Sequence, residues 1–286
     1  MAFKSGFVAI VGQANVGKST LINHLIGKKV SIVSPKPQTT RDQILGVDNG
    51  EDYQIIFIDT PGIHKTKNKL DKHMQETIDE AAADVDVLLY IIDGHKEISH
   101  EDLKRLGQYT DKGYPVFVVI NKADLENYQT IYPKLDRIKD LAGVDEFFVV
   151  SAKTGKNLDE LKKAIISKLS DTVVYFPRDA YSAQSLGFDL AELIREKILW
   201  LLDDEIPHGV GVEITDLVKG ETTHVSATIY CEKENHKAII IGAKGAMLSK
   251  IGTECRLAME KMLGTKVFLE LFVKVKLNWR DKVKFE

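Results

Sequence analysis

The residues of this chain best suited to chemistry by type and spacing lie near its start, at positions 12–20. Gly12, Gly17, Lys18 and Ser19 fill every fixed position of the pattern Gly-x-x-x-x-Gly-Lys-Ser/Thr. In such a loop, backbone N–H groups point at phosphates, the lysine reaches the β- and γ-phosphates, and the hydroxyl holds Mg²⁺. The predicted contacts with a nucleoside triphosphate are Gly12, Asn15, Val16, Gly17, Lys18, Ser19 and Thr20.

The segments around this loop place it between a strand and a helix. Residues 7–11 form an apolar run of strand type, and residues 21–26 have a helical pattern. Further apolar runs alternate with helical segments, which is typical of a mainly parallel sheet covered by helices on both faces. We therefore predict a doubly wound α/β domain that binds its ligand at the carboxyl ends of its strands.

A second phosphate element follows the apolar strand 53–58. Asp59 closes this strand, and Gly62 comes three positions later. At the end of a strand beside the phosphate loop, the Asp59 carboxylate would face the Mg²⁺ that Ser19 holds. The N–H of Gly62 would then meet the γ-phosphate. The pattern Asp-x-x-Gly is common in turns, and it gains its meaning here from its place after a phosphate loop.

Two later loops carry residues that can read a base. Asp124, in Asn121-Lys122-Ala123-Asp124, can accept two hydrogen bonds from the ring N–H and the exocyclic amine of guanine, a donor pair that adenine lacks. Lys122 would lie over the base, Asn121 would tie loops together, and a backbone N–H of residues 151–153 would meet the guanine oxygen. The predicted ligands are therefore GTP and GDP, with base-site contacts from Asn121, Lys122, Asp124, Ser151, Ala152 and Lys153.

These segments, in this order, resemble the translation-factor-related branch of small GTPases over residues 5–170. The resemblance implies that Thr40 senses the γ-phosphate and Mg²⁺, and that Asp59 holds Mg²⁺ through water. Ras-like proteins place a water-positioning glutamine directly after the Asp-x-x-Gly glycine, whereas this chain has Ile63 there. We therefore expect slow intrinsic hydrolysis.

Asn15 resembles the asparagine of potassium-activated relatives that carry a hydrophobic residue in place of that glutamine. The resemblance implies that K⁺ supplies the positive charge that an arginine finger supplies elsewhere. The residues expected to act in hydrolysis are Lys18, Thr40, Gly62 and Asn15. The expected Mg²⁺ ligands are Ser19, Thr40 and Asp59.

A second, smaller domain is predicted after the GTPase-like part. Residues 172–185 have no clear period and are expected to link a domain at 1–171 to one at 186–286. The second domain reads helix, strand, strand, helix, helix, strand, an α+β pattern. Gly242-Ala243-Lys244-Gly245 lies between its two later helices, where a Gly-x-x-Gly turn lets the backbone approach the sugar-phosphate of single-stranded RNA.

Charge is distributed unevenly along this second half. Residues 177–236 hold 5 Lys/Arg against 12 Asp/Glu, a balance of −7, and residues 237–286 hold 11 against 5, a balance of +6. Such an asymmetry indicates either a polyanionic partner or a solvated basic face. The RNA-binding candidates are Ile241, Gly242, Ala243, Lys244, Gly245, Lys250, Lys274, Lys276 and Arg280.

The element order around the turn is similar to a type II KH domain, and the whole chain resembles the Era family of bacterial GTPases. The segments that carry the resemblance are 12–19, 38–41 (Gln-Thr-Thr-Arg), 59–63, 121–124, 192–197 and 239–251. It implies binding to the 3′ end of small-subunit ribosomal RNA, a role in 30S subunit assembly, and peripheral association with the cytoplasmic membrane. The family's KH turn usually reads Gly-Lys-Gly-Gly, so the lysine of this chain is shifted by one position, and we expect this shift to affect RNA affinity rather than fold.

Two other functions fit the same residues. One is a nucleotide-gated RNA tether with little turnover, and the other is an RNA-associated GTPase that is not dedicated to the ribosome. A single phosphate loop and the lack of a long apolar segment count against a metal-transport or RNA-modifying partner.

Composition sets the remaining expectations. The chain has 286 residues, 44% hydrophobic and 28% charged, with a net charge of −3, as in ordinary soluble proteins of about two domains. The longest apolar run, 85–92, is too short to cross a bilayer, and Met1–Ser5 leads directly into a strand, so we expect neither a transmembrane segment nor a signal peptide. Cys231 and Cys255 lack metal-ligand spacing, which favours reduced cysteines in a cytoplasmic protein.

Overall fold

The computed structural model describes residues 2–36, 39–63, 69–83, 85–111, 113, 115–139, 143–203, 206 and 209–277. The chain divides into two compact units, Met1–Ala183 and Gln184–Glu286. Each unit has a hydrophobic core of its own. No helix in the described ranges has the length and apolar character needed to cross a membrane.

The first unit alternates strands and helices. Its strands are β1 (Lys4–Gly12), β2 (Ile44–Asn49), β3 (Tyr53–Asp59), β4 (Val87–Asp93), β5 (Val116–Asn121) and β6 (Val144–Val149). Its helices are α1 (Lys18–Ile26), α2 (Lys69–Ala81), α3 (His100–Thr110), α4 (Tyr128–Asp136) and α5 (Leu158–Lys168).

The six strands form one sheet in the order β2-β3-β1-β4-β5-β6. β2 and β3 pair antiparallel as a hairpin, and every other pair is parallel. The mainly parallel sheet predicted from the apolar runs is therefore confirmed. Parallel strands covered on both faces are apolar along their whole length, and all seven residues of β4 are buried accordingly.

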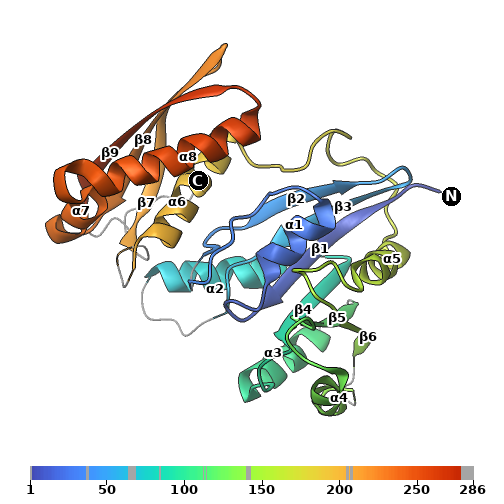
Figure 1. The fold of residues 1–286 in the computed structure, drawn as a ribbon. Helices are drawn as coiled ribbons and strands as arrows, with labels where there is room; N and C mark the ends of the chain where they lie inside the picture. Colours follow the sequence, from blue (N-terminus) through green and yellow to red (C-terminus); the bar gives the residue numbers. More distant parts are fainter. Residues whose placement is uncertain are drawn as a thin grey trace. The chain divides into compact units, whose positions relative to one another are not determined.

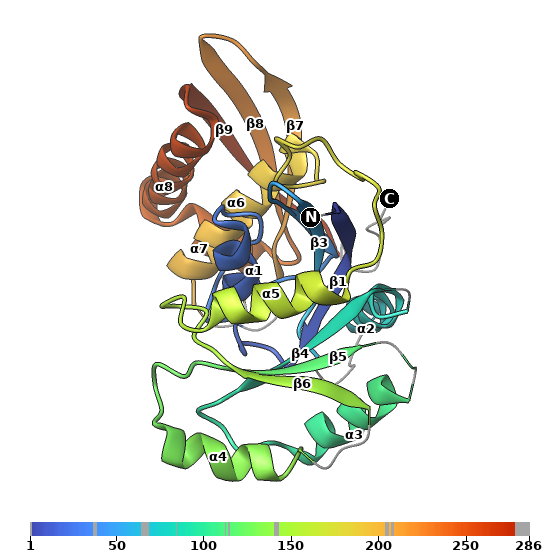
Figure 2. The same ribbon diagram turned by 90° about the vertical axis from the view of Figure 1, so that its right-hand side faces the viewer.

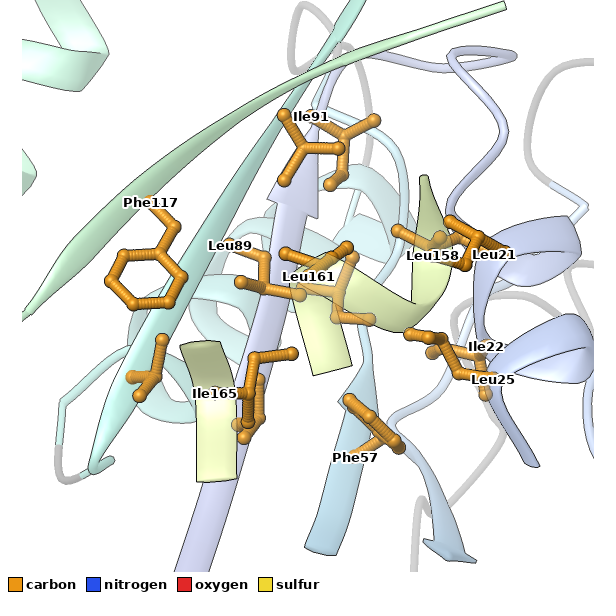
Figure 3. Close-up of a cluster of buried hydrophobic side chains, with 14 of the residues drawn as sticks. Leu21, Ile22, Leu25, Phe57, Leu89, Ile91, Phe117, Leu158, Leu161 and Ile165 are labelled. Carbon is orange, nitrogen blue, oxygen red and sulfur yellow. The ribbon is translucent and has the colours of Figure 1, made fainter. Parts of the chain in front are cut away.

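Helices cover both faces of this sheet (Figures 1 and 2). On one face, Leu89 and Ile91 of β4 pack with side chains of α1 and α5, as Figure 3 shows around Leu21, Leu161 and Ile165. On the other face, Leu88 and Tyr90 of the same strand pack with residues of α2, α3 and α4. Because strand side chains alternate, a continuous apolar strand serves both cores, and burying each large side chain contributes about 1.5–3 kcal/mol.

Two helices of the first unit are not among the elements expected from the sequence. α2 follows the phosphate-site loop after Gly62, and α4 carries Pro133 in its interior. A proline normally interrupts a helix, which hides α4 from a pattern-based prediction. Asn127 nevertheless starts α4 as an N-cap, because its side chain accepts a hydrogen bond from the N–H of Thr130.

The second unit has the predicted element order. It consists of α6 (Leu186–Leu201), β7 (Gly211–Val218), β8 (Thr222–Cys231), α7 (Glu234–Ile241), a 3-10 turn (Ala243–Gly245), α8 (Ala246–Leu263) and β9 (Lys266–Val275). The sheet order is β7-β8-β9, with β7 antiparallel and β9 parallel to β8. All three helices lie on one face of this sheet (Figure 1), and their side chains form one core with those of its strands.

The segment expected as a linker, 172–185, is largely part of the first unit. The buried side chain of Gln54 accepts hydrogen bonds from the N–H groups of Tyr175 and Phe176 at 2.8 and 3.0 Å. Further on, the N–H of Ala183 donates to the carbonyl of Leu45 in β2 at 3.1 Å. The division between the units thus falls after Ala183, because hydrogen bonds to β2 and β3 fasten a segment without its own pattern.

Candidate nucleotide and RNA sites

The phosphate loop has the backbone that its glycines predict. Gly12 and Gly17 have φ angles of 151° and 100°, and Asn15 adopts the left-handed conformation at 64°. A Cβ at Gly12 would lie 2.5 Å from the carbonyl oxygen of Ile91, and one at Gly17 would lie 2.3 Å from Nδ2 of Asn121. Both positions therefore require glycine for conformation and for space.

Lys18 is buried beneath this loop. Its Nζ donates to the carbonyl oxygens of Gly12 and Gln13 at 2.9 and 3.0 Å. Burial lowers the pKa of Lys18 from 10.5 to about 8, and the negative charge of Asp59 partly opposes this shift. Phosphate oxygens can replace these two carbonyls and would supply the negative charge that the desolvated ammonium lacks.

The three residues predicted to bind Mg²⁺ lie together. Oγ of Ser19 is 3.1 Å from Oγ1 of Thr40, and both hydroxyls favour the charged form of the Asp59 carboxyl. Ser31 donates to Oδ2 of Asp59 at 2.6 Å, whereas its buried Oδ1 has no hydrogen-bond partner. Burial raises the pKa of Asp59, chiefly by desolvation.

This donor set fits Mg²⁺. The cation prefers hard oxygen ligands and keeps several waters, and an unsatisfied buried carboxylate oxygen is what a bound ion or its water would pair. Ser19, Thr40 and Asp59 would hold it. Ser31 was missed by the sequence analysis because its link to Asp59 spans 28 positions and has no local pattern.

The loop after Asp59 packs directly on the phosphate loop. A Cβ at Gly62 would lie 2.7 Å from Cα of Ala14, and the N–H of Ile63 donates to the carbonyl of Gly12 at 3.1 Å. The Ile63 side chain is buried in the core on the α2 and α3 side of the sheet. It therefore does not point at the phosphate site and cannot take the place of a water-positioning glutamine.

A cavity opens over these elements. Its walls come from the phosphate loop, the segment before Thr40 and the Asp-x-x-Gly loop. The lining residues are Ala14, Asn15, Gly17, Lys18, Ser19, Thr20, Ile32, Val33, Ser34, Thr39, Thr40 and Gly62.

Asn121 joins the phosphate loop to the base loops. Its Nδ2 donates to the carbonyl of Val16 at 2.8 Å, and its Oδ1 accepts from the N–H of Ala152 at 2.8 Å. The buried Asn121 amide thus fixes the loop at 151–153 relative to the phosphate loop. The Ala152 N–H, one of the backbone N–H groups of 151–153 from which the contact to the guanine oxygen was expected, is already engaged, so its contact with the base would require it to be shared.

Two carboxylates position the rest of the base site. Oδ1 of Asp124 accepts a hydrogen bond from Oγ of Ser151 at 2.6 Å, which orients the exposed carboxylate proposed to read guanine. Asp93, buried at the end of β4, accepts from Nζ of Lys122 at 2.8 Å. Asp93 was not predicted as a site residue, although its place at the end of an apolar strand matches that of Asp59.

In the second unit, the Gly-x-x-Gly turn is built from left-handed backbone. The φ angles are 73° at Gly242, 52° at Lys244 and 82° at Gly245. A Cβ at Gly242 would lie 2.7 Å from Cβ of Met247, so that position needs glycine. Lys244 adopts the same left-handed region at a cost of about 1–2 kcal/mol, so the shifted lysine occupies a position whose backbone favours glycine.

A groove of about 450 Å³ runs beside this turn, between α8 and β9. This volume is within the range of ligand-binding pockets. Gly252 of α8 lines the groove next to β9, and a Cβ added there would make an ordinary contact with Cδ1 of Leu271 at 3.6 Å. The lining residues are Gly245, which was predicted to bind RNA, and seven residues that were not predicted: Leu248, Ser249, Gly252, Thr253, Arg256, Leu269 and Leu271.

The predicted basic residues do not all reach this groove. Lys244 and Lys250 are exposed at the turn and on the first half of α8. Lys274 is different, because strand alternation places it on the face of β9 opposite Leu269 and Leu271. Lys276 lies over the ring of Tyr230, 5.2 Å from its centroid, also away from the groove. Arg280 and Gln38 lie outside the described residues.

Comparison with known proteins gives consistent matches. Residues 7–122 match the family model "50S ribosome-binding GTPase", and residues 205–280 match the model "KH domain". GTPase Era of Alkaliphilus metalliredigens is 44% identical over 286 residues, covering 99% of this chain and 97% of that protein.

Two solved structures are similar over nearly the whole chain. A variant of Aquifex aeolicus Era bound to GDP and AlF4⁻ is 40% identical, with a TM-score of 0.93, over 97% of this chain and 96% of that one. A structure of Era with MgGDPNP and nucleotides 1506–1542 of 16S ribosomal RNA has the same identity and TM-score and covers 97% and 95%.

Proposed function

Because this chain belongs to the Era family of GTPases, we propose that it is a GTP-hydrolysing switch that binds the 3′ end of small-subunit ribosomal RNA through its KH domain and assists 30S assembly. The family predicted from the sequence is confirmed. The observation that carries the proposal is one chain with both a phosphate-site cavity, whose loop Asn121 joins to the base loops, and a left-handed Gly-x-x-Gly turn beside an open groove.

Different residues of the first unit bind the phosphates, the metal ion and the base. The phosphate loop and Lys18 bind the triphosphate, and Mg²⁺, when bound, neutralises charge that develops on the phosphate oxygens. Ser19, Thr40 and Asp59 would hold that ion, and the N–H of Gly62 would contact the γ-phosphate. Asp124, oriented by Ser151, selects guanine. With Ile63 turned into the core, we expect slow intrinsic turnover.

The main chain after Thr40 leads into a strand that is hydrogen-bonded to the last residues of the first unit. The residues after Thr40 enter β2, and β2 binds the segment that precedes Gln184. The N–H of Val47 donates to the carbonyl of Tyr181 at 3.0 Å, and a bridge pairs Gly46 with Ser182. If GTP orders Thr40, it acts on the strand that holds this segment, and reciprocity then requires RNA to change GTP affinity equally.

RNA binding in three nucleotide states tests the coupling. Fluorescence anisotropy of an oligonucleotide with the 3′-terminal 16S sequence is measured with GDPNP, GDP and no nucleotide. We expect the GDPNP form to bind at least about fivefold more tightly, the lower end of typical allosteric coupling. Lys244→Ala should weaken binding, whereas Lys261→Ala, an equal charge change at the exposed far end of α8, should not. Equal affinity in all three states would exclude the switch.

Measuring steady-state phosphate release distinguishes a GTP-hydrolysing switch from a nucleotide-gated RNA tether with little turnover. Multiple turnovers with GTP support the enzyme, and a single turnover without recycling supports a nucleotide-gated tether. Sequencing RNA crosslinked to the GTP-bound protein tests whether the target is ribosomal. The peripheral membrane association, implied by the resemblance, and the cytoplasmic location, favoured by the cysteine spacing, both stay predictions.

We also propose that K⁺ activates hydrolysis through Asn15. The Asn15 side chain is exposed at the cavity, and its Nδ2 donates to the carbonyl of Pro35 at 2.8 Å, which links the phosphate loop to the segment before Thr40. A cation beside the Asn15 carbonyl would supply the positive charge that an arginine finger supplies elsewhere. Turnover is compared in KCl and NaCl for the wild type and Asn15→Ala. Equal rates of the wild type in the two salts would refute the proposal.

A further inference from the structure

The side chain of Gln13, at a variable position of the phosphate loop, is fastened to α3. Its Nε2 lies 2.7 Å from Oδ2 of Asp102 and 2.9 Å from Oγ of Ser99. Ser99 and Asp102 form the capping box that begins α3. The phosphate loop is thus tied to a helix terminus 86 and 89 positions further along the chain.

Asp102 is a rigid anchor. It is buried, and its Oδ2 also accepts from Oγ of Ser99 at 2.6 Å, while Oδ1 accepts from the hydroxyl of Tyr90 at 3.0 Å. Tyr90 is fully buried in β4. A buried carboxylate needs several donors, and Gln13 supplies one of them from the loop itself. The loop is therefore joined to the core and not only to a surface helix.

The main chain of Gln13 touches the parts that act on phosphate. Its carbonyl accepts from Nζ of Lys18 at 3.0 Å, and Gln13 forms an isolated parallel bridge with Ile63. Beside this bridge, Gly62 can approach Ala14 only because it lacks a Cβ. The position of the Gln13 backbone therefore sets both the resting place of Lys18 and the course of the Asp-x-x-Gly loop.

We propose that Gln13 is a positioning residue for GTP hydrolysis, holding the phosphate loop and the Gly62–Ile63 segment together through its bond to Asp102. The proposal rests on the GTPase activity proposed above. Since Ile63 offers no side chain to the reaction, alignment depends on this backbone contact, and small displacements of reacting groups cost rate steeply. Nucleotide affinity depends less on this backbone contact, because the base site also contributes to binding.

The test separates rate from affinity. kcat and KM for GTP, and Kd for GDP, are measured for the wild type, Gln13→Ala and Gln108→Ala, an exposed glutamine on α3 that serves as the matched control. We expect Gln13→Ala to lower kcat about tenfold, about 1.4 kcal/mol, with KM and Kd changed less than about twofold. Equal kcat in the two variants overturns the proposal, and so does a parallel loss of rate and affinity. Turnover by the wild type separately tests the GTPase activity itself.

Gln13→Glu provides a second signature. The introduced carboxyl faces Asp102, and two adjacent carboxyls repel when ionised but share a proton as the pH falls. The ratio of variant to wild-type kcat should therefore rise between about pH 8 and about pH 6. In the described part of the chain, Arg105 and Tyr109 on α3 act electrostatically on Tyr90, the donor to Asp102, and these groups are common to both proteins. A flat ratio overturns the proposal.

Discussion

Nucleotide binding should be coupled to proton uptake by Lys18. Burial lowers the pKa of Lys18 from 10.5 to about 8, so about half of these side chains are neutral at pH 8 before nucleotide binds. Phosphates beside the ammonium favour its charged form. Binding should therefore take up about half a proton per nucleotide at pH 8 and about a tenth at pH 7.

The same shift sets the direction of two pH dependences. Because the pKa of Lys18 is lower in the folded than in the unfolded chain, its charged form costs the nucleotide-free protein about 3 kcal/mol of stability below pH 8. This cost disappears as the pH rises toward 10.5. Nucleotide affinity moves the other way and falls as the pH rises above about 8, since binding must then recharge the lysine.

Calorimetry measures this uptake directly. GDP is titrated at pH 8 in two buffers with different ionisation enthalpies, and the difference in apparent enthalpy gives the protons exchanged. EDTA is present, because burial raises the pKa of Asp59 and Mg²⁺ binding there would release protons of its own. Lys18→Met should abolish the uptake, whereas Lys28→Met, an exposed lysine just after α1, should retain it. Zero uptake by the wild type, or full uptake by Lys18→Met, would refute the reasoning.

Three substitutions test other parts of the two sites. Asp124→Asn should weaken GDP binding more than about 100-fold, because two charge-assisted hydrogen bonds are lost, and should favour xanthosine diphosphate. Competition against fluorescent GDP measures the affinity for both nucleotides. Unchanged GDP affinity would contradict the base-site assignment. Gly62→Ala should lower kcat about tenfold at unchanged GDP affinity, because its Cβ would lie 2.7 Å from Cα of Ala14; wild-type turnover would show that this contact is dispensable. Gly252→Leu should fill the groove beside Leu271 and lower RNA affinity at least about tenfold with helicity retained by circular dichroism. Gly252→Ala is its control and should keep RNA affinity while stabilising α8 by up to about 1 kcal/mol; equal RNA binding by both variants would move the RNA site elsewhere.

The predicted RNA residues show where a sequence pattern stops being informative. The Gly-x-x-Gly turn was recognisable because its glycines are needed for left-handed backbone next to Met247. The basic residues after it were grouped by charge alone. On β9, however, side chains alternate between faces, so Lys274 points away from the groove that Leu269 and Leu271 line. Charge in a linear segment does not specify a face until the strand's register is known.

The connecting segment shows the same limit. Residues 172–183 have neither helical nor strand periodicity, because their hydrogen bonds go to Gln54 and to the main chain of β2. Those partners are more than a hundred positions away in the sequence, as the 121 positions between Gln54 and Tyr175 illustrate. A segment held by distant partners looks like a linker when it is read locally.

The sequence by itself determined the kind of ligand and the order of the strands. Phosphate binding needs glycines and a lysine at fixed local spacing, and a buried parallel strand needs an unbroken apolar run, so both are written within a few consecutive residues. Only the tertiary structure decided which side chains complete the sites: Asp93 with Lys122, Ser31 with Asp59, and Gln13 with Asp102. Each of these pairs joins residues from separate elements, and only folding of the sheet and its loops brings them within hydrogen-bonding distance.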